Sequence, residues 1–130
     1  MPVTLSIDTE RKLTITTGEG GVTDADFIEA RRQLLAHPDF DPSFDRIWDF
    51  RRVTESQVTG DVIVRLVAES PNAGKPICRA VVVSERAGPM KAILDFISHT
   101  RQASRRVAAF PDLASAEKWV LTTRNDLPPV

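Results

Sequence analysis

The sequence predicts a small α/β domain, with a mostly parallel sheet of five strands and about four helices. Two observations carry this prediction. Apolar runs with strand periodicity alternate with helical segments along most of the chain, which is typical of parallel strands joined by crossover helices. The first two strands are instead joined by a short polar turn, so we expect the first strand to run antiparallel to the second.

The composition is that of one ordinary globular domain. We place this domain at residues 1–124 of the 130, with residues 125–130 as a C-terminal tail. The 17 basic and 18 acidic residues give a formal net charge of −1, which offers no general attraction for nucleic acid. No apolar stretch approaches the ~20 residues of a membrane span. The N-terminus lacks the pattern of a signal peptide, so we expect a cytoplasmic protein.

The first two strands are predicted as a hairpin. Val3, Leu5 and Ile7 alternate with polar residues, and the pattern resumes at Leu13 and Ile15 after the polar turn. We interpret the glycine-rich segment at residues 18–21 as a flexible turn that ends the second strand. A phosphate loop is not favoured there, because the spacing G-x-G-x-x-G is absent.

A capped helix follows the hairpin. Thr23 is a typical N-cap residue, and Asp24 and Asp26 lie in the first turn, where the helix dipole favours carboxylates. We expect the helix to end near His37, because Pro38 disfavours helical backbone in the residue before it. Its apolar face is predicted from five residues: Phe27, Ile28, Ala30, Leu34 and Leu35.

The third strand is predicted as the short buried run RIWDF at residues 46–50. It stops at a charged loop, and the chain then enters a helix capped by Thr59. That helix is predicted from one apolar face: Val62, Ile63, Leu66 and Val67.

The rest of the chain repeats the alternation. Residues 77–84 predict a strand buried on both faces, and residues 107–110 a short last strand. Between them, Pro89 suits the first turn of a helix whose apolar face is Met90, Ile93, Leu94 and Ile97. A final helix opens near Ser115 and carries three residues on one side: Ala116, Trp119 and Val120.

The residue types that most often carry chemistry are sparse. Cys78 is the only cysteine, which excludes an internal disulfide, and its apolar neighbours favour a buried core thiol. His37 and His99 have neither a second ligand nor a nucleophile beside them, so we expect no metal, no cofactor and two surface histidines. Trp48 and Trp119 are expected in the core.

A candidate site comes from the topology. The carboxyl ends of parallel strands meet at one edge of a sheet, where open α/β sheets place their binding sites. Asp49 and Arg51 are two residues apart at such an end, so their side chains should leave on the same side. A structural ion pair is one reading. In the other, Arg51 or Arg52 holds an anion or the carboxylate of a partner. The edge would gather residues 18–21, 49–52, 84–86 and 110–112.

The chain resembles the SpoIIAA-like branch of the STAS domains, the anti-sigma-factor-antagonist fold, with a relation of the STAS/SEC14 type. Three segments carry the resemblance, which covers nearly the whole chain: GEGGVTDADFIEARRQLLAHPDFDPSFDRIWDFRRV, then VTGD at residues 58–61, then RRVAAFPDLASAEKWV. It implies a regulatory or binding module rather than an enzyme.

The resemblance also implies a candidate phosphosite. In partner-switching members of the family, a kinase phosphorylates a serine within an Asp-Ser-Ser-Gly motif, at the start of the helix after the third strand. The matching positions here are Thr59 and Gly60, preceded by Val58, so the Asp-Ser of the motif is absent. A plain N-cap role for Thr59 is the alternative.

Two functions follow from these observations. The first is a non-catalytic STAS-like module that binds a protein, a kinase or regulator by resemblance. Its site residues would be Asp49, Arg51, Arg52, Thr59 and Gly60. The second is binding of a small apolar or lipid-like ligand, as the SEC14-type relation implies. A homodimer is compatible with either function, and an enzyme that uses Asp49 as a base is disfavoured.

Overall fold

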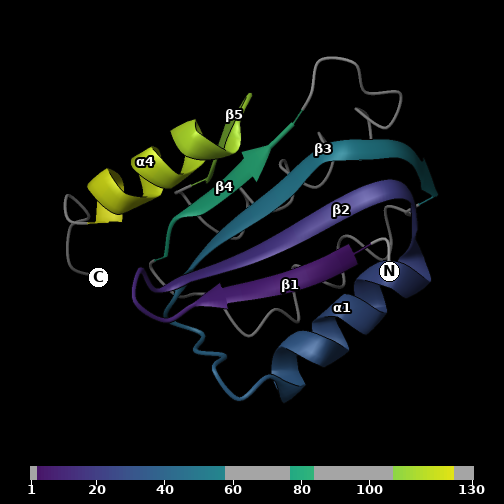
Figure 1. The fold of residues 1–130 in the computed structure, drawn as a ribbon, viewed down its shortest axis with the longest axis horizontal. Helices are drawn as coiled ribbons and strands as arrows, with labels where there is room; N and C mark the ends of the chain where they lie inside the picture. The colour runs from purple at the N-terminus through teal and green to yellow at the C-terminus, as the bar shows by residue number, and fades with distance from the viewer. Residues whose placement is uncertain (1–2, 58–76, 84–106, 125–130) are drawn as a thin grey trace.

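The computed structural model describes residues 3–57, 77–83 and 107–124 of the chain. These residues form one five-stranded sheet with two helices against it (Figure 1). The elements in chain order are β1 (Val3–Asp8), β2 (Leu13–Thr23), α1 (Asp24–Ala36), β3 (Asp45–Gln57), β4 (Arg79–Val82), β5 (Val107–Phe110) and α4 (Leu113–Thr123).

The strands lie in the sheet in the order of the sequence, β1-β2-β3-β4-β5. β1 is antiparallel to β2, and every other neighbouring pair is parallel. The predicted α/β class, the five strands and the antiparallel first strand are therefore confirmed. Of the roughly four predicted helices, two are present in the described ranges. The segments predicted to form the other two, and the predicted tail at residues 125–130, lie outside those ranges.

The predicted hairpin is confirmed, and Asp8 organises its turn. The Asp8 carboxylate accepts hydrogen bonds from the backbone N–H groups of Glu10 (3.1 Å) and Arg11 (3.0 Å), and from Nε of Arg11 at 2.7 Å. Lys12 has φ 56°, the left-handed conformation that closes the turn. Local polar chemistry thus sets the register of β1 against β2.

The strands β2 and β3 are both longer than predicted. The glycine-rich segment at residues 18–21 is not a turn, because β2 continues through it to Thr23. The charged segment after Phe50 is not a loop, because β3 continues to Gln57. The two extensions pair with each other in parallel, from Glu19 opposite Arg52 onward. Both predictions were wrong for the same reason. Each extension is a strand because it pairs with the other extension, and neither segment has a sequence pattern that reveals this pairing.

Bulges allow this pairing. Between Thr17 and Glu19 β2 advances by two residues while β3 advances by three, and a second shift follows between Gly20 and Gly21. Side chains of β3 pack closely over Gly18: a Cβ there would be 2.9 Å from Cγ2 of Val53. The glycines therefore serve close packing and local backbone shape rather than a turn.

The helix α1 begins and ends as predicted. Oγ1 of Thr23 accepts from the backbone N–H of Asp26 (3.3 Å), and the Asp26 carboxylate accepts from the backbone N–H of Thr23 (2.9 Å), which forms a capping box. His37 is the C-cap residue. The predicted apolar face is only partly correct. Ala30 and Leu34 are buried and Phe27 packs against the core, but Ile28 and Leu35 are 42% and 56% exposed.

The core has two clusters, one on each face of the sheet. Ala30 of α1 belongs to the cluster that includes Val81 of β4, whereas Ala116 of α4 belongs to the cluster that includes Val82. Successive residues of a strand point to opposite faces, so α1 and α4 cover opposite faces of the sheet. β4 is buried on both faces as predicted, although it is shorter than predicted, and Cys78 is fully buried in the α4 cluster.

The helix α4 starts two residues before the predicted Ser115. Its N-cap is Asp112, whose carboxylate accepts a hydrogen bond from the backbone N–H of Ser115 at 2.7 Å. Trp119 packs against the α4 cluster beside Phe110, and Trp48 packs against the α1 cluster, so both tryptophans contribute to the core as predicted. Neither helix in the described part of the chain is long and apolar enough to cross a membrane.

Candidate functional site

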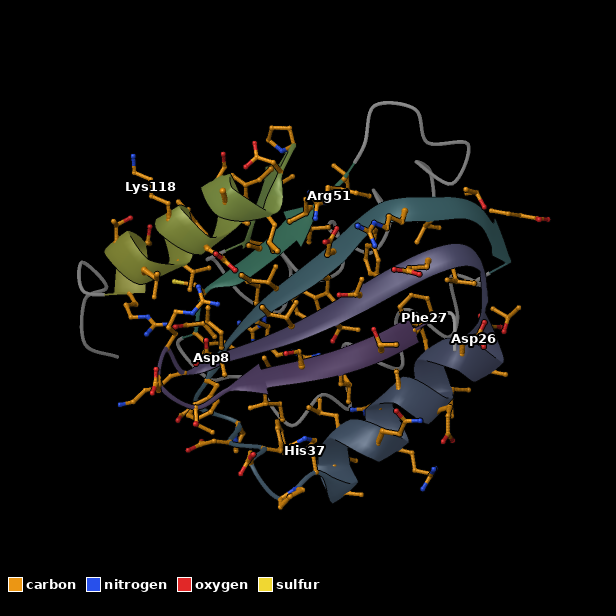
Figure 2. The ribbon with its side chains drawn as sticks, viewed as in Figure 1. Asp8, Asp26, Phe27, His37, Arg51 and Lys118 are labelled. Carbon is orange, nitrogen blue, oxygen red and sulfur yellow. The ribbon has the colours of Figure 1, made fainter. Side chains whose placement is uncertain are left out.

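The edge of the sheet where β4 and β5 end contains the predicted pair Asp49 and Arg51. Asp49 is in register with Val82, the last residue of β4, and Val82 is in register with Phe110, the last residue of β5. Asp49 lies on the α4 face, because it is two residues beyond Ile47 of the α4 cluster. Figure 2 shows Arg51 beside the end of β4 and the start of α4.

Asp49 and Arg51 form a bidentate ion pair, which is one of the two alternatives that the sequence left open. Nε of Arg51 donates to Oδ1 of Asp49 at 2.9 Å, and Nη2 donates to Oδ2 at 2.7 Å. The backbone N–H of Arg51 also donates to Oδ1, at 3.2 Å. The Asp49 side chain is 9% exposed and the Arg51 side chain 34% exposed. Asp49 therefore fixes the orientation of an arginine that still reaches solvent.

The electrostatics keep this pair ionised. Burial alone would raise the pKa of Asp49, but hydrogen bonds from the side chain and backbone of Arg51, with the charges of Arg51 and Arg52, lower it below its usual value. The hydrogen bond to Asp49 raises the pKa of Arg51 in turn, and the charge of Asp112 adds to that effect. A carboxylate bound in this way is poorly suited to accept a proton from a substrate.

Asp112 also belongs to this site. The sequence predicted that residues 110–112 lie at this edge, but it predicted no role for Asp112. Its hydrogen bond from the backbone of Ser115 is the main cause that lowers its pKa, and the charge of Arg51 contributes. The N-cap of α4 and the ion pair on β3 are thus electrostatically coupled. The N-cap role of Asp112 could have been predicted from the sequence, because aspartate is a preferred N-cap residue and Asp112 directly precedes the helix.

Arg52 lies farther along the edge, on the paired extensions of β2 and β3. Its Nη1 donates to Oε1 of Glu19 at 3.0 Å, and the two residues are opposite each other in the parallel pair. Both side chains are exposed, at 72% and 54%, so the pair contributes little to stability. The glycine-rich segment thus reaches the edge as predicted, but as part of a strand.

The remaining predicted site residues are not brought together with Arg51 by the described structure. Thr59, Gly60 and residues 84–86 lie outside the described residues, so the phosphosite stays a prediction. β3 extends from Arg51 to Gln57, a distance of roughly 20 Å at the usual rise of a strand. The predicted end of the strand at Phe50 is therefore wrong, and the helix predicted to start at Thr59 lies outside the described residues.

No metal site appears in the described ranges, where no group of three or more His, Cys, Asp or Glu side chains could hold an ion. His37 lies at the C-terminal end of α1 (Figure 2), and its Nδ1 accepts a hydrogen bond from the backbone N–H of Asp39 at 3.0 Å. It has a structural role in the turn after the helix. His99 lies outside the described residues.

Comparison of the chain with protein-family models, with curated proteins and with solved structures found no match. The resemblance to the SpoIIAA-like STAS domains therefore stays a prediction from the sequence, and the candidate site is interpreted from its own geometry.

Proposed function

We propose that the protein is a non-catalytic, STAS-like binding module that recognises an acidic segment of a protein partner at the edge around Arg51. The observation that carries this proposal is the state of Arg51, which is held by Asp49 and yet one third exposed. A side chain fixed before binding loses little conformational entropy when a partner arrives, and this favours affinity.

The donors of Arg51 suit a carboxylate. Its pair with Asp49 uses Nε and Nη2, which leaves Nη1 for a further acceptor. Arg52, the next residue of β3, offers a second guanidinium. It could bind a partner once its exposed ion pair with Glu19 breaks. Arginine is the preferred residue for planar recognition of carboxylates at interfaces. An acidic partner segment therefore fits this edge better than a basic one.

Binding is favoured over catalysis because of how Asp49 is occupied. A general base needs a lone pair free to accept a proton and a pKa near the working pH. Asp49 has both oxygens in hydrogen bonds to Arg51, and its pKa is lowered rather than raised. These features support a role for Asp49 in positioning Arg51.

The test starts with the full chain as bait, followed by affinity measurements with the purified partner. We expect Arg51→Ala to weaken binding by about tenfold or more, because it removes a charge-assisted hydrogen bond at the interface. Arg32→Ala is the matched control, since Arg32 is an exposed arginine of α1, far from the edge and paired with Glu29. Binding should also weaken as salt is added.

Thr59→Glu tests the candidate phosphosite with the same partner. If Thr59 acts as the resemblance implies, the added charge weakens binding, while Thr59→Ser preserves it. Unchanged affinity in both Arg51→Ala and Thr59→Glu, with folding checked by circular dichroism, would show that the partner uses another surface.

A further inference from the structure

The helix α1 carries apolar side chains on the side that faces away from the sheet. Among the described residues, Ile28 and Leu35 are the exposed large hydrophobic side chains, at 42% and 56%. Both belong to α1 and are seven residues apart, about two helical turns, so they lie on one face of the helix. Figure 1 shows α1 at the margin of the molecule. A helix that only covers a sheet needs apolar residues on its inner side alone.

The outer side of α1 has the spacing of a helix–helix contact. We call four of its exposed residues the outer stripe: Ala25, Ile28, Arg32 and Leu35. The steps between them are three, four and three residues, the pattern with which one helix packs along another. The residues on the inner side of α1 are Phe27, Ala30 and Leu34. At about 100° per residue, the two sets lie on opposite sides of the helix.

The charges of α1 suit an antiparallel neighbour of the same sequence. All three acidic residues of α1 precede both of its arginines. A second copy of α1 that runs in the opposite direction would set its basic half against the acidic half of the first, and the two helix dipoles would also oppose each other. A parallel copy would place like charges together, which is unfavourable.

Glu29 and Arg32 lie on either side of the midpoint of the outer stripe. Nε of Arg32 donates to Oε2 of Glu29 at 2.8 Å, and the two side chains are 69% and 41% exposed. In a symmetric antiparallel pair, Arg32 of one copy and Glu29 of the other would be offset by only about 1.5 Å along the helix axis. The ion pairs of the two copies would therefore join into one network of four charges, which stabilises more than an isolated exposed pair does.

We infer that the protein forms a symmetric homodimer in which the outer stripes of two α1 helices pack antiparallel. Ala25 of one copy faces Leu35 of the other, a small residue against a large one. Ile28 faces Arg32, whose aliphatic stem packs on it while the guanidinium reaches Glu29. The helix α1 covers the face of the sheet opposite Asp49, so the dimer contact and the proposed partner edge are separate surfaces.

The contact is small, so the dimer is weak. The helix α1 has 13 residues and is roughly 20 Å long. One helix pair of this length is smaller than a typical stable interface, and we expect a Kd of about 100 µM. At the low micromolar concentrations of affinity and unfolding measurements the chain is then monomeric, and substitutions on the outer stripe leave those measurements undisturbed.

The first test is sedimentation equilibrium of the full chain, from about 10 µM to about 1 mM protein. We expect a reversible rise in mass from monomer to dimer and no growth beyond it, because a two-fold contact closes on itself. A monomer over the whole range would overturn the inference and leave the outer stripe to a different protein. Growth beyond the dimer would overturn the two-fold arrangement.

Charge reversal tests the network of Glu29 and Arg32. Arg32→Glu places a carboxylate beside Glu29 of the second copy, and Glu29→Arg places two arginines together, so each variant alone should dimerise at least tenfold more weakly. An equimolar mixture of the two variants should dimerise again, because a doubly basic stripe then faces a doubly acidic one. Lys118→Glu is the control, an equal reversal at an exposed position of α4, and it should dimerise as the wild type does. A mixture that stays monomeric would contradict the contact.

The apolar part of the outer stripe is tested by truncation. Ile28→Ala and Leu35→Ala should each raise the Kd of the dimer by about tenfold, because one substitution in a symmetric contact removes a side chain from both copies. Each side chain is exposed in the single chain, so the substituted chain still folds. Wild-type dimerisation in both variants would show that the copies associate through another surface.

Cysteine cross-linking tests the direction of the two helices. In the antiparallel pair, Cα atoms of residue 25 in the two copies are roughly 15 Å apart along the axis, beyond the ~7 Å that a disulfide spans. Ala25→Cys alone should therefore not cross-link at about 1 mM, whereas its mixture with Leu35→Cys should. The native Cys78 is fully buried and does not compete. Cross-linking of Ala25→Cys with itself would show a parallel pair and overturn the inference, as would absence of a cross-link in the mixture.

Discussion

Asp45 and Arg124 form an ion pair that joins the first residue of β3 to the C-cap of α4, with 2.7 Å between Oδ2 and Nη2. The Asp45 carboxylate also accepts a hydrogen bond from the backbone N–H of Cys78 at 2.7 Å, just before β4. Arg124 also donates from Nη1 to the carbonyl oxygen of Arg11, at 2.8 Å. One mostly buried pair therefore links the β1–β2 turn, β3, β4 and the end of α4.

This arrangement predicts that Arg124→Met destabilises the protein by about 2–4 kcal/mol, because it leaves the buried Asp45 carboxylate without its charged partner. Urea unfolding measures the change in free energy of unfolding. Lys118→Met is the matched control, since it removes a positive charge from an exposed position of α4 (Figure 2) and should cost less than about 0.5 kcal/mol. Equal losses in the two variants would contradict the structural role of the pair.

The Asp49–Arg51 pair predicts a dependence of stability on pH. The pKa of Asp49 is lower in the folded protein than its unfolded value of about 3.9. The stabilisation is therefore fully present above about pH 4 and is lost as the pH falls through the folded pKa. Carbon-13 NMR of the Asp49 carboxyl group during an acid titration would measure that folded pKa directly.

Removing the arginine should reverse the shift. In Arg51→Gln, burial is expected to dominate and to raise the pKa of Asp49, so acid unfolding should begin at higher pH. The loss near neutral pH should be about 1 kcal/mol, less than for a fully buried pair, because solvent screens the partly exposed Arg51. Arg52→Gln should leave the acid transition nearly unchanged. An unshifted transition in Arg51→Gln would show that the pair is not maintained in solution.

The two glycines of β2 predict opposite outcomes for the same substitution. In Gly18→Ala the new methyl group would lie 2.9 Å from Cγ2 of Val53, and we expect a loss of about 1–3 kcal/mol from overpacking. In Gly21→Ala the methyl group would meet nothing within 4 Å, and the φ of Gly21 is not positive, so the effect should stay within about 0.5 kcal/mol. Similar losses at both positions would argue against the close packing of the Val53 side chain over Gly18.

Elements with local chemical signals were predictable from the sequence. The capping box of Thr23 and Asp26 and the polar turn at Asp8 each act within a few residues, so the start of α1 and the hairpin could be located. The extensions of β2 and β3 could not, because they are strands only through their pairing with each other. Gly18 was interpreted as a turn residue, whereas its lack of a side chain serves packing across that pair.

In the candidate site, too, local features could be predicted from the sequence and features that depend on strand pairing could not. Asp49 and Arg51 are two residues apart on one strand, so strand periodicity predicted that their side chains leave on the same side, where they form an ion pair. The neighbouring positions of Arg46 and Arg79 depend on the register between β3 and β4, which no spacing within the sequence determines. The partner, the ligand and the phosphorylation of Thr59 stay predictions, because each depends on a molecule other than this chain.

The helix α1 provides a last prediction, on two adjacent leucines that the sequence assigned to one apolar face. Leu34 is fully buried and Leu35 is 56% exposed. Leu34→Ala should therefore cost about 2–5 kcal/mol through lost burial and the cavity that remains. Leu35→Ala should change the free energy of unfolding by less than about 0.5 kcal/mol, since its environment changes little on unfolding. Urea unfolding at several protein concentrations checks both values. A large, concentration-dependent loss in Leu35→Ala alone would mean that this face of α1 is covered by a second copy of the chain.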